Sequence, residues 1–350
     1  MRNEHTIAVC FYGNKAASHS CLDAIRHIDS ELILVDDGSP DDTWVRLEVY
    51  RAANPDQPIR LVRHARNLGL SEARNTAINA AQGAIIYFTS SDCAPDPDWV
   101  ARLSACFDDP DVVAASGTTL DHPPRTLAEA AFTRSTYLPH GQTPGRKLVG
   151  NNMAFRRSIL LLESFDPALR LYCDEDELAW RLTELGYKIA FAKDAIVRHD
   201  HPLTIRQYLR QARQQGQGSA RFWYKQGKYI GRDILPVTLA LLSLPLGFLS
   251  LWLLLVPAFF ATAQLGALVY NQHALKGKTL GTAVKVLPVE IAYSACKTTS
   301  VYLTLLRILL GYEPAIVRSK REWRNRRKSR GDGRPAEGEG GEQLRDDGRG

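Results

Sequence analysis

Four short apolar runs, separated by stretches with helical spacing, fill the first ninety residues of this chain. The runs span residues 7–11, 32–35, 59–62 and 84–88, and the helical patterns span residues 20–28, 42–52 and 71–81. This alternation is typical of a mostly parallel sheet that helices cover on both faces. Ligands of such sheets bind beyond the carboxyl ends of the strands. We therefore expect a Rossmann-like α/β domain with its site where these runs end.

The pattern after residue 112 is less regular. Residues 178–185 form a helical pattern that Gly186 ends, and residues 188–192 read as a strand. Residues 203–226 predict a long basic helix whose interleaved aromatic residues suit a membrane surface. Gly216 and Gly218 weaken the helix prediction at that point.

A long uncharged stretch covers residues 234–270. It is nearly twice as long as the roughly 20 residues that cross a bilayer once. A second apolar stretch, residues 282–312, carries Lys285, Glu290 and Lys297. This stretch is either a span with functional charges or an amphipathic helix in the membrane interface. The sequence thus predicts C-terminal transmembrane helices.

The charge distribution predicts the topology. The net charge is +6 and the pI about 9.0, but much of the excess lies in residues 318–330, directly after the apolar region. Such a cluster indicates a cytoplasmic membrane flank rather than nucleic-acid binding. The N-terminus has no apolar stretch of signal-peptide length, and the six cysteines are scattered without Cys-x-x-Cys spacing, as in a cytosolic domain.

We therefore expect a multi-pass protein of the cell (inner) membrane with three regions. Residues 1–230 form a cytosolic catalytic domain, residues 231–312 a membrane region, and residues 313–350 a basic, then disordered, cytosolic tail. Both ends in the cytosol require an even number of crossings. Either residues 234–270 form a hairpin and the second stretch is interfacial, or each stretch crosses once, which we favour.

Acidic residues stand at two predicted strand ends. Asp36 and Asp37 follow the second run, where carboxylates can accept hydrogen bonds from a nucleotide base or ribose, although a turn role is the alternative. Asp92 follows the fourth run after Ser90 and Ser91. A carboxylate there can hold a divalent cation, Mg²⁺ or Mn²⁺, that neutralises a diphosphate.

Two further groups have both a functional and a structural interpretation. Arg66 and Arg74 flank the start of the third helical pattern, where they can face phosphate or form a solvated basic face. The acidic residues Asp174, Glu175 and Asp176 open the helical pattern at 178–185. By themselves they suit a solvated helix start, which the helix dipole favours.

Together these segments resemble a family 2 glycosyltransferase with a GT-A fold. The resemblance rests on Val35-Asp36-Asp37-Gly38-Ser39, Asn67-Leu68-Gly69 with Ala73-Arg74-Asn75, Ser90-Ser91-Asp92, Gly150-Asn151-Asn152-Met153-Ala154-Phe155-Arg156, Asp174-Glu175-Asp176-Glu177-Leu178 with Arg181, and Val197-Arg198-His199. The six segments occur in the family's order over roughly residues 5–220.

The resemblance implies roles for single residues. It makes Asp92 a metal ligand with His199 beside it, and an acid among Asp174, Glu175 and Asp176 the general base of an inverting transfer. The nucleotide-sugar-binding residues that it implies are Tyr12, Asp36, Asp37, Arg66, Arg74, Ser90, Ser91 and Asn152. Two positions depart from the family's pattern: Ser90 replaces the first aspartate of Asp-x-Asp, and Glu175 occupies the position of the base.

The predicted function is sugar transfer from a UDP- or GDP-linked donor to an envelope saccharide or lipid-linked acceptor, with no nucleic-acid partner. The alternative is a non-catalytic scaffold for envelope polysaccharide assembly, in which Ser90 marks a decayed metal site. A nucleotidyltransferase would need a Gly-rich phosphate loop after the first strand, which residues 10–15 do not provide. A polysaccharide synthase that exports its product would need more membrane segments.

Overall fold

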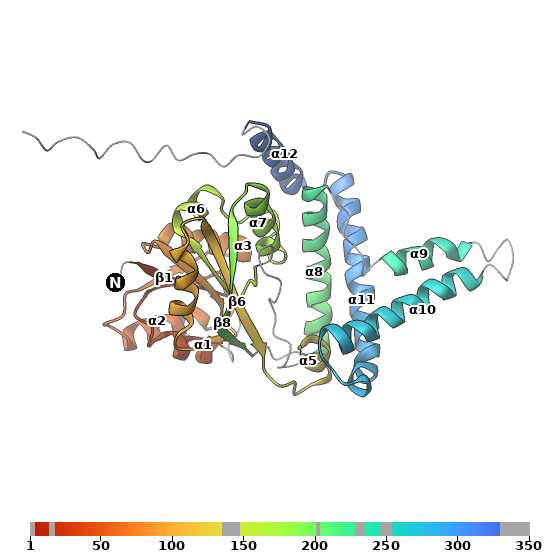
Figure 1. Ribbon diagram of the computed structural model, residues 1–350, viewed down its shortest axis with the longest axis horizontal. Helices are drawn as coiled ribbons and strands as arrows, with labels where there is room; N and C mark the ends of the chain where they lie inside the picture. Colours follow the sequence, from red (N-terminus) through yellow and green to blue (C-terminus); the bar gives the residue numbers. More distant parts are fainter. Residues whose placement is uncertain are drawn as a thin grey trace, which may run out of the picture.

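An eight-stranded sheet of order β3-β2-β1-β4-β7-β6-β8-β5 forms the centre of the N-terminal part (Figure 1). The computed structural model describes residues 4–13, 18–134, 148–200, 204–227, 235–245 and 254–329. The strands are β1 (His5–Phe11), β2 (Glu31–Asp36), β3 (Ile59–Arg63), β4 (Ile85–Ser90), β5 (Cys93–Pro95), β6 (Val112–Asp121), β7 (Asn152–Arg156) and β8 (Lys188–His199). The helices of this part are α1 (Ser18–Ile25), α2 (Thr43–Ala53), α3 (Leu70–Ala80), α4 (Trp99–Ser104), α5 (Leu127–Phe132), α6 (Arg157–Leu162) and α7 (Asp174–Glu184).

The sheet is mixed, so the prediction of a mostly parallel sheet was wrong. β3, β2, β1 and β4 run parallel, as the alternating pattern predicted, and β6 pairs with β8 in parallel. β7, however, runs antiparallel to both β4 and β6, and β5 runs antiparallel to β8. These directions follow from the strands with which β7 and β5 pair, and the apolar pattern of a strand does not encode them.

Alternate residues of the central strands feed two hydrophobic cores, one on each face of the sheet. On one face Ile7 and Val9 pack with α1, α2 and α4, and on the other Ala8 and Ile33 pack with α3, α6 and α7. Burial on both faces explains why these strands are continuous apolar runs instead of alternating ones. β8 continues to His199, seven residues beyond the predicted strand, because its second half pairs with β5 and with the end of β6.

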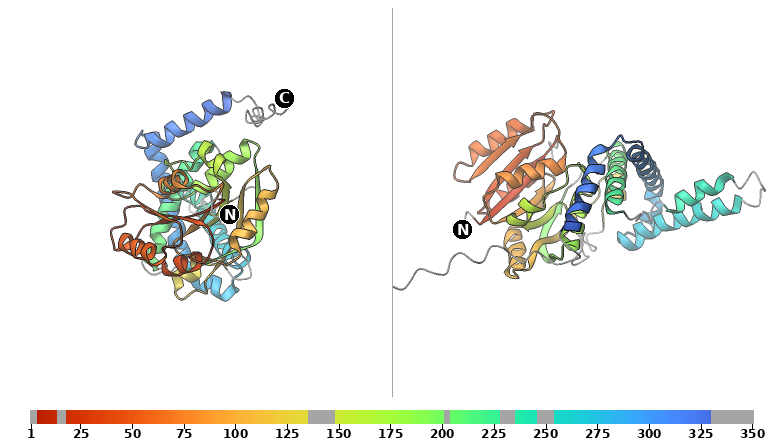
Figure 2. Two further views of the ribbon diagram at one scale, coloured as in Figure 1. Left: turned by 90° about the vertical axis from the view of Figure 1, so that its left-hand side faces the viewer. Right: turned by 90° about the horizontal axis from the view of Figure 1, so that it is seen from above.

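Helices α8 (Ile205–Gln226) and α11 (Leu280–Leu309) lie side by side along the sheet domain (Figures 1 and 2). The predicted long basic helix is confirmed, and Thr204 starts it with a capping box. Its two glycines do not interrupt it but permit close packing. A Cβ on Gly216 would lie 2.5 Å from the Lys297 carbonyl oxygen of α11, and one on Gly218 would lie 2.4 Å from the Tyr172 carbonyl oxygen.

The two remaining apolar helices, α9 (Leu235–Ser243) and α10 (Leu255–Tyr270), pack against each other and project away from the sheet domain (Figures 1 and 2). A π-helical turn (Asn271–Leu275) leads from α10 toward α11. No single described helix has both the length and the apolarity needed to cross a membrane. Leu280–Leu309 and Pro314–Arg327 meet that test only as a pair, bent by 74°. The transmembrane helices stay a prediction, and parts of the uncharged stretch lie outside the described residues.

Helix α12 (Pro314–Ser329) turns back onto the sheet domain. Trp323 packs against Trp180 of α7 with ring centroids 5.3 Å apart, and Arg326 and Arg327 pair with Glu163 and Glu184. The basic segment therefore has one face docked on the sheet domain. The predicted disorder of the last twenty residues lies outside the described residues.

Candidate active site

A cavity of about 410 Å³ opens beyond the carboxyl ends of β1 and β2, where the sequence placed the site. The loops after β1, β2 and β3, the start of α3, the segment around Arg170 and one face of α8 surround it. Its lining residues include Tyr12, Asp37, Asn67, Gly69, Leu70 and Arg170. Tyr12 is half exposed at the rim, so its ring can stack on a flat ligand.

The Asp36–Ser39 turn holds the loops around this cavity together. Asp36 Oδ1 accepts a hydrogen bond from the Ser39 amide, and Ser39 Oγ accepts one from the Gly13 amide in the loop after β1. Gly38 has φ +69°, and a Cβ there would lie 2.5 Å from the Arg66 carbonyl carbon. Only glycine fits that conformation and that approach.

Asp37 joins the same turn to the start of α3. One of its oxygens accepts the Leu68 amide at 2.8 Å and contacts His64 Nδ1 at 2.7 Å, while the other accepts the Gly69 amide at 2.9 Å. These contacts shape the cavity wall. A direct contact of Asp36 or Asp37 with base or ribose stays a prediction.

The two predicted phosphate-binding arginines have different surroundings. Arg66 is exposed and directly precedes the lining residue Asn67, and no described residue pairs with its guanidinium. Arg74 is buried, with Nη1 at 2.7 Å from Asp174 Oδ2 and Nη2 donating to the Gly150 carbonyl at 2.6 Å. The geometry of Arg74 is therefore that of a positioning residue for the acidic helix start.

A second cavity of about 360 Å³ adjoins the first, and Leu70 and Leu171 line both. It brings together Ser90 and Asp92 from the end of β4, His199 from β8, and Glu175 from α7. Residues from β6, α5 and α8 complete its wall: Thr119, Phe132, Gln211 and Gln215. Groups more than a hundred residues apart thus share one cleft.

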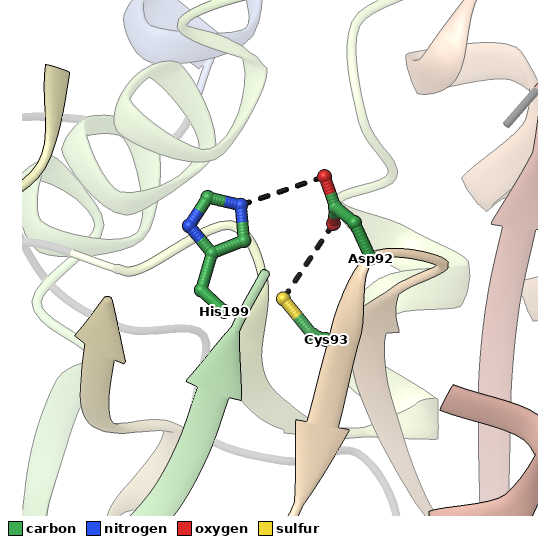
Figure 3. A group of neighbouring side chains, drawn as sticks. All are labelled: Asp92, Cys93 and His199. Carbon is green, nitrogen blue, oxygen red and sulfur yellow. Dashed lines mark hydrogen bonds and ion pairs between the residues drawn. The ribbon is translucent and has the colours of Figure 1, made fainter. Parts of the chain in front are cut away.

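Strand register places the candidate metal ligands together. Cys93 and Asp121 are both register partners of His199, from β5 on one side and β6 on the other. His199 Nε2 lies 3.4 Å from Asp92 Oδ2, and Nδ1 lies 3.0 Å from Asp121 Oδ1. Figure 3 shows the side chains of Asp92 and Cys93, at the start of β5, pointing toward that of His199 at the end of the adjacent strand β8.

This donor set fits a hard divalent cation. A carboxylate on one imidazole nitrogen, with the other nitrogen aimed at a second carboxylate, is the usual way to orient a metal-binding histidine. Burial by itself would lower the pKa of His199, but Asp92 and Asp121 outweigh it and raise that pKa to about 10. The cluster therefore attracts positive charge. Burial, reinforced by Asp92, raises the pKa of Cys93 well above its ordinary value, so the thiol stays protonated and is a poor ligand.

Of the three candidate bases, Glu175 lines the second of these two cavities, and Asp174 and Asp176 line neither. Asp174 is fully buried against Arg74, while Asp176 is half buried on the first turn of α7. Gly150 leaves room for Glu175, since a Cβ at that position would lie 3.1 Å from its Oε1. Burial, Asp174 and Asp176 raise the pKa of Glu175 well above the usual glutamate value, which suits a base working near neutral pH.

The other residues predicted to bind the nucleotide sugar differ in how close they lie to the cleft. Ser90 lines it, and Ser91 is buried next to Asp92. Asn152 is fully buried in the sheet, where its Nδ2 donates to the Thr118 and Ala195 carbonyls and its Oδ1 accepts from Trp99 Nε1. Its place in donor binding stays a prediction that this geometry does not support.

Sequence reasoning missed several polar residues of the site, among them Asp121, Gln211 and Gln215. Asp121 ends the apolar run of β6, the same signal that drew attention to Asp36 and Asp92, so it could have been found. Gln211 and Gln215 face the cleft from α8. Nothing in the sequence distinguishes them from the other glutamines of that helix.

Fold and cleft together define the chain as a glycosyltransferase with a GT-A-like fold. The model of "Glycosyl transferase family 2" matches residues 6–160, and that of "Glycosyl transferase family group 2" matches residues 85–273. The chain belongs to the family 2 glycosyltransferases.

Individual relatives are more distant. The uncharacterized glycosyltransferase EpsJ of Bacillus subtilis is 40% identical over 90 residues, which is 25% of each chain. Glycosyltransferase AglE of Haloferax volcanii is 22% identical over 228 residues, 62% of this chain and 73% of AglE. The solved mannosyltransferase PcManGT from Pyrobaculum calidifontis, in complex with GDP-Man and Mn²⁺, has a TM-score of 0.56 and 22% identity, with 85% of this chain and 88% of that one covered. The last likeness confirms the fold.

Proposed function

We propose that this glycosyltransferase moves a sugar, with inversion, from a UDP- or GDP-linked donor to a saccharide or lipid-linked acceptor at the cytosolic face of a membrane. The observation that carries the proposal is the second cavity, where Glu175 faces the same space as Asp92 and His199. A base and a diphosphate-binding pair in one cleft are the two groups that a direct displacement needs.

The two adjoining cavities give the donor its orientation. The nucleotide lies in the cavity lined by Tyr12 and Asn67, and the diphosphate and sugar extend past Leu70 into the second cavity. Glu175 takes the proton of the acceptor hydroxyl while that oxygen bonds to the anomeric carbon. The bond from this carbon to the diphosphate breaks on the opposite side, which inverts the configuration.

Asp92 and His199 are the residues that would hold Mg²⁺ or Mn²⁺. The bound cation supplies charge neutralisation for the departing diphosphate. The presence of Mn²⁺ with GDP-Man in the solved mannosyltransferase agrees with this assignment. Ser90 keeps a hydroxyl at the first Asp-x-Asp position, so Asp92 remains the only carboxylate of that motif.

The membrane part of the proposal rests on α9 and α10. Their uncharged surface exposes large side chains, among them Leu242, Leu255 and Phe259. Large exposed apolar patches mark interaction or membrane sites. α11 lies along α8, which carries five basic residues. This arrangement favours the topology in which residues 234–270 form a hairpin in the bilayer and α11 lies at the interface.

Calorimetry of donor binding tests the proposal. The full chain is titrated with UDP- and GDP-sugars, with and without Mn²⁺. We expect Mn²⁺-dependent binding that Asp92→Ala abolishes, whereas Asp98→Ala, an equal charge change on exposed surface outside both cavities, leaves it intact. Donor binding that is the same with and without Mn²⁺, or unchanged in Asp92→Ala, would instead favour the scaffold alternative.

A further inference from the structure

A third cavity, of about 620 Å³, lies between α8 and α11 near the start of α12. Gln217 and Arg221 line both this cavity and the donor-side cavity, so the two share a wall. Its far wall belongs to α11 and contributes Cys296, Thr299, Ser300, Leu303, Thr304 and Arg307. Neither the proposed transfer nor the sheet domain needs these α11 side chains.

The cavity carries an excess of positive charge. Arg221 makes two hydrogen bonds of 3.3 Å with Glu313, and Arg307 Nε donates to the same carboxylate at 3.2 Å. Arg213 is exposed at the cavity, and no described residue pairs with its guanidinium. Two guanidinium groups thus share one carboxylate, and a third, that of Arg213, lines the same cavity, so the three arginines and Glu313 leave the lining with more positive than negative charge.

Guanidinium groups in this number suit phosphate. The planar N–H groups of a guanidinium match the oxygens of a phosphate, and a guanidinium is more weakly hydrated than an ammonium group. The hydroxyls of Thr299 and Thr304 line the same cavity and add hydrogen-bond donors. A sugar hydroxyl would not require three cations, so the chemistry favours an anion.

Apolar side chains are exposed beside the cavity on α11. Leu303 lines it and is exposed, and Leu306, Leu310 and Tyr312 are exposed on the same end of α11 and the turn that follows. A positively charged cavity and an exposed apolar surface, formed by Leu303, Leu306 and Leu310, are thus next to each other. A ligand that fills both must have an anionic head and an apolar tail.

We propose that this cavity binds the phosphate group of an anionic lipid. Arg213 and Arg307 hold the phosphate, and Arg221 joins them as the phosphate displaces Glu313. The acyl chains lie over the exposed leucines. In Figure 1 this corner, where α11 passes into α12, is well separated from the projecting α9–α10 pair. The chain therefore has a second lipid contact that recognises a headgroup.

Calorimetry of the full chain in neutral detergent, without donor or metal, tests this inference. Short-chain phosphatidate, short-chain phosphatidylcholine and inorganic phosphate are titrated in separate arms. We expect phosphatidate to bind, phosphatidylcholine not to bind, and inorganic phosphate to bind far more weakly because it lacks chains. Equal affinity for inorganic phosphate and phosphatidate would overturn the assignment to a lipid.

Variants locate the site. Arg213→Gln with Arg307→Gln should weaken phosphatidate binding at least about tenfold, the effect of losing charge-assisted hydrogen bonds worth about 1.4 kcal/mol or more. The control, Arg206→Gln with Arg210→Gln, removes the same charge from exposed positions of α8 outside the cavity. Glu313→Gln should tighten binding because it removes the competing carboxylate. Equal weakening in the control pair, or no tightening in Glu313→Gln, contradicts the proposal. Because no donor is present, these results are independent of the transfer reaction.

Discussion

The carboxyl of Glu175 lies in the cleft because residues of three segments make room for it and orient it. Gly150 provides the space, Arg74 lies 4.0 Å away through Nη1, and the first turn of α7 directs the side chain. Burial and the charges of Asp174 and Asp176 raise its pKa. The base is therefore protonated, and inactive, over a wider pH range than an ordinary glutamate.

The pH profile of Asp176→Asn tests this electrostatic account. Activity requires the ionised Glu175, so it is present at high pH and lost as pH falls through the raised pKa. Removing the negative charge of Asp176 lowers that pKa, and the acid limb of kcat/KM should move to lower pH with the alkaline plateau retained. An unmoved limb contradicts the coupling, and loss of the plateau would make Asp176 the base.

Asp121 gives a second prediction for a single residue. Asp121→Asn should lower Mn²⁺ affinity about 10–100-fold, the usual cost of removing the carboxylate behind a metal-binding histidine. Electron paramagnetic resonance of free Mn²⁺ measures it without any transfer assay. Asp109→Asn, a change on an exposed side chain three residues before β6, is the control. Unchanged affinity in Asp121→Asn would remove Asp121 from the site.

Sequence reasoning worked for residues whose neighbours along the chain are themselves informative. Asp92, His199 and Glu175 lie in motifs, and the structure brings all three into one cleft. Its place at the end of an apolar run marks Asp121 as a candidate, but its contact with His199 depends on the β6–β8 register, which no local pattern reports. The burial of Asn152 likewise depends on backbone carbonyls of two other strands.

Among the elements, α8 contacts both α11 and the Tyr172 segment beside the cleft through its two glycines. Gly218→Ala should destabilise the fold or displace the Tyr172 segment, because overpacking costs about 1–3 kcal/mol and the gain in helix propensity returns only about 1. Gly216→Ala should do the same at α11. Thermal unfolding measures stability, with Gly281→Ala as a control that meets no atom within 4 Å. Equal melting temperatures for all three variants would contradict this packing.

The predicted elements were correct where periodicity alone decides them. The first four strands and the helices between them lie where the apolar runs placed them, within a few residues. β7 and β5 reverse the sheet because of pairings with β4, β6 and β8, which a single strand's composition does not encode. Gly216 and Gly218 weakened the prediction of α8 because glycine has a low helix propensity, whereas their packing against other segments is not visible in the sequence.

Across the whole molecule, the abrupt loss of charge after Asp233 separates the sheet domain from the projecting α9–α10 pair. Leu255→Glu with Phe259→Glu should release the chain from neutral vesicles, since both side chains are largely exposed on α10. Flotation measures the bound fraction. Leu161→Glu with Leu162→Glu makes the same change on exposed positions of α6 and should have no effect. Release by both pairs alike would argue against a membrane role for α9–α10.

The most direct test of the whole account is sugar transfer by wild type and Glu175→Gln at matched donor occupancy. Radiolabelled UDP- and GDP-sugars are supplied with Mn²⁺ and membrane extract, and label in the acceptor fraction is counted. We expect transfer by the wild type and a loss of about 10²–10⁴-fold in Glu175→Gln, with donor affinity retained. Transfer by Glu175→Gln at the wild-type rate would contradict the assignment of Glu175 as the base.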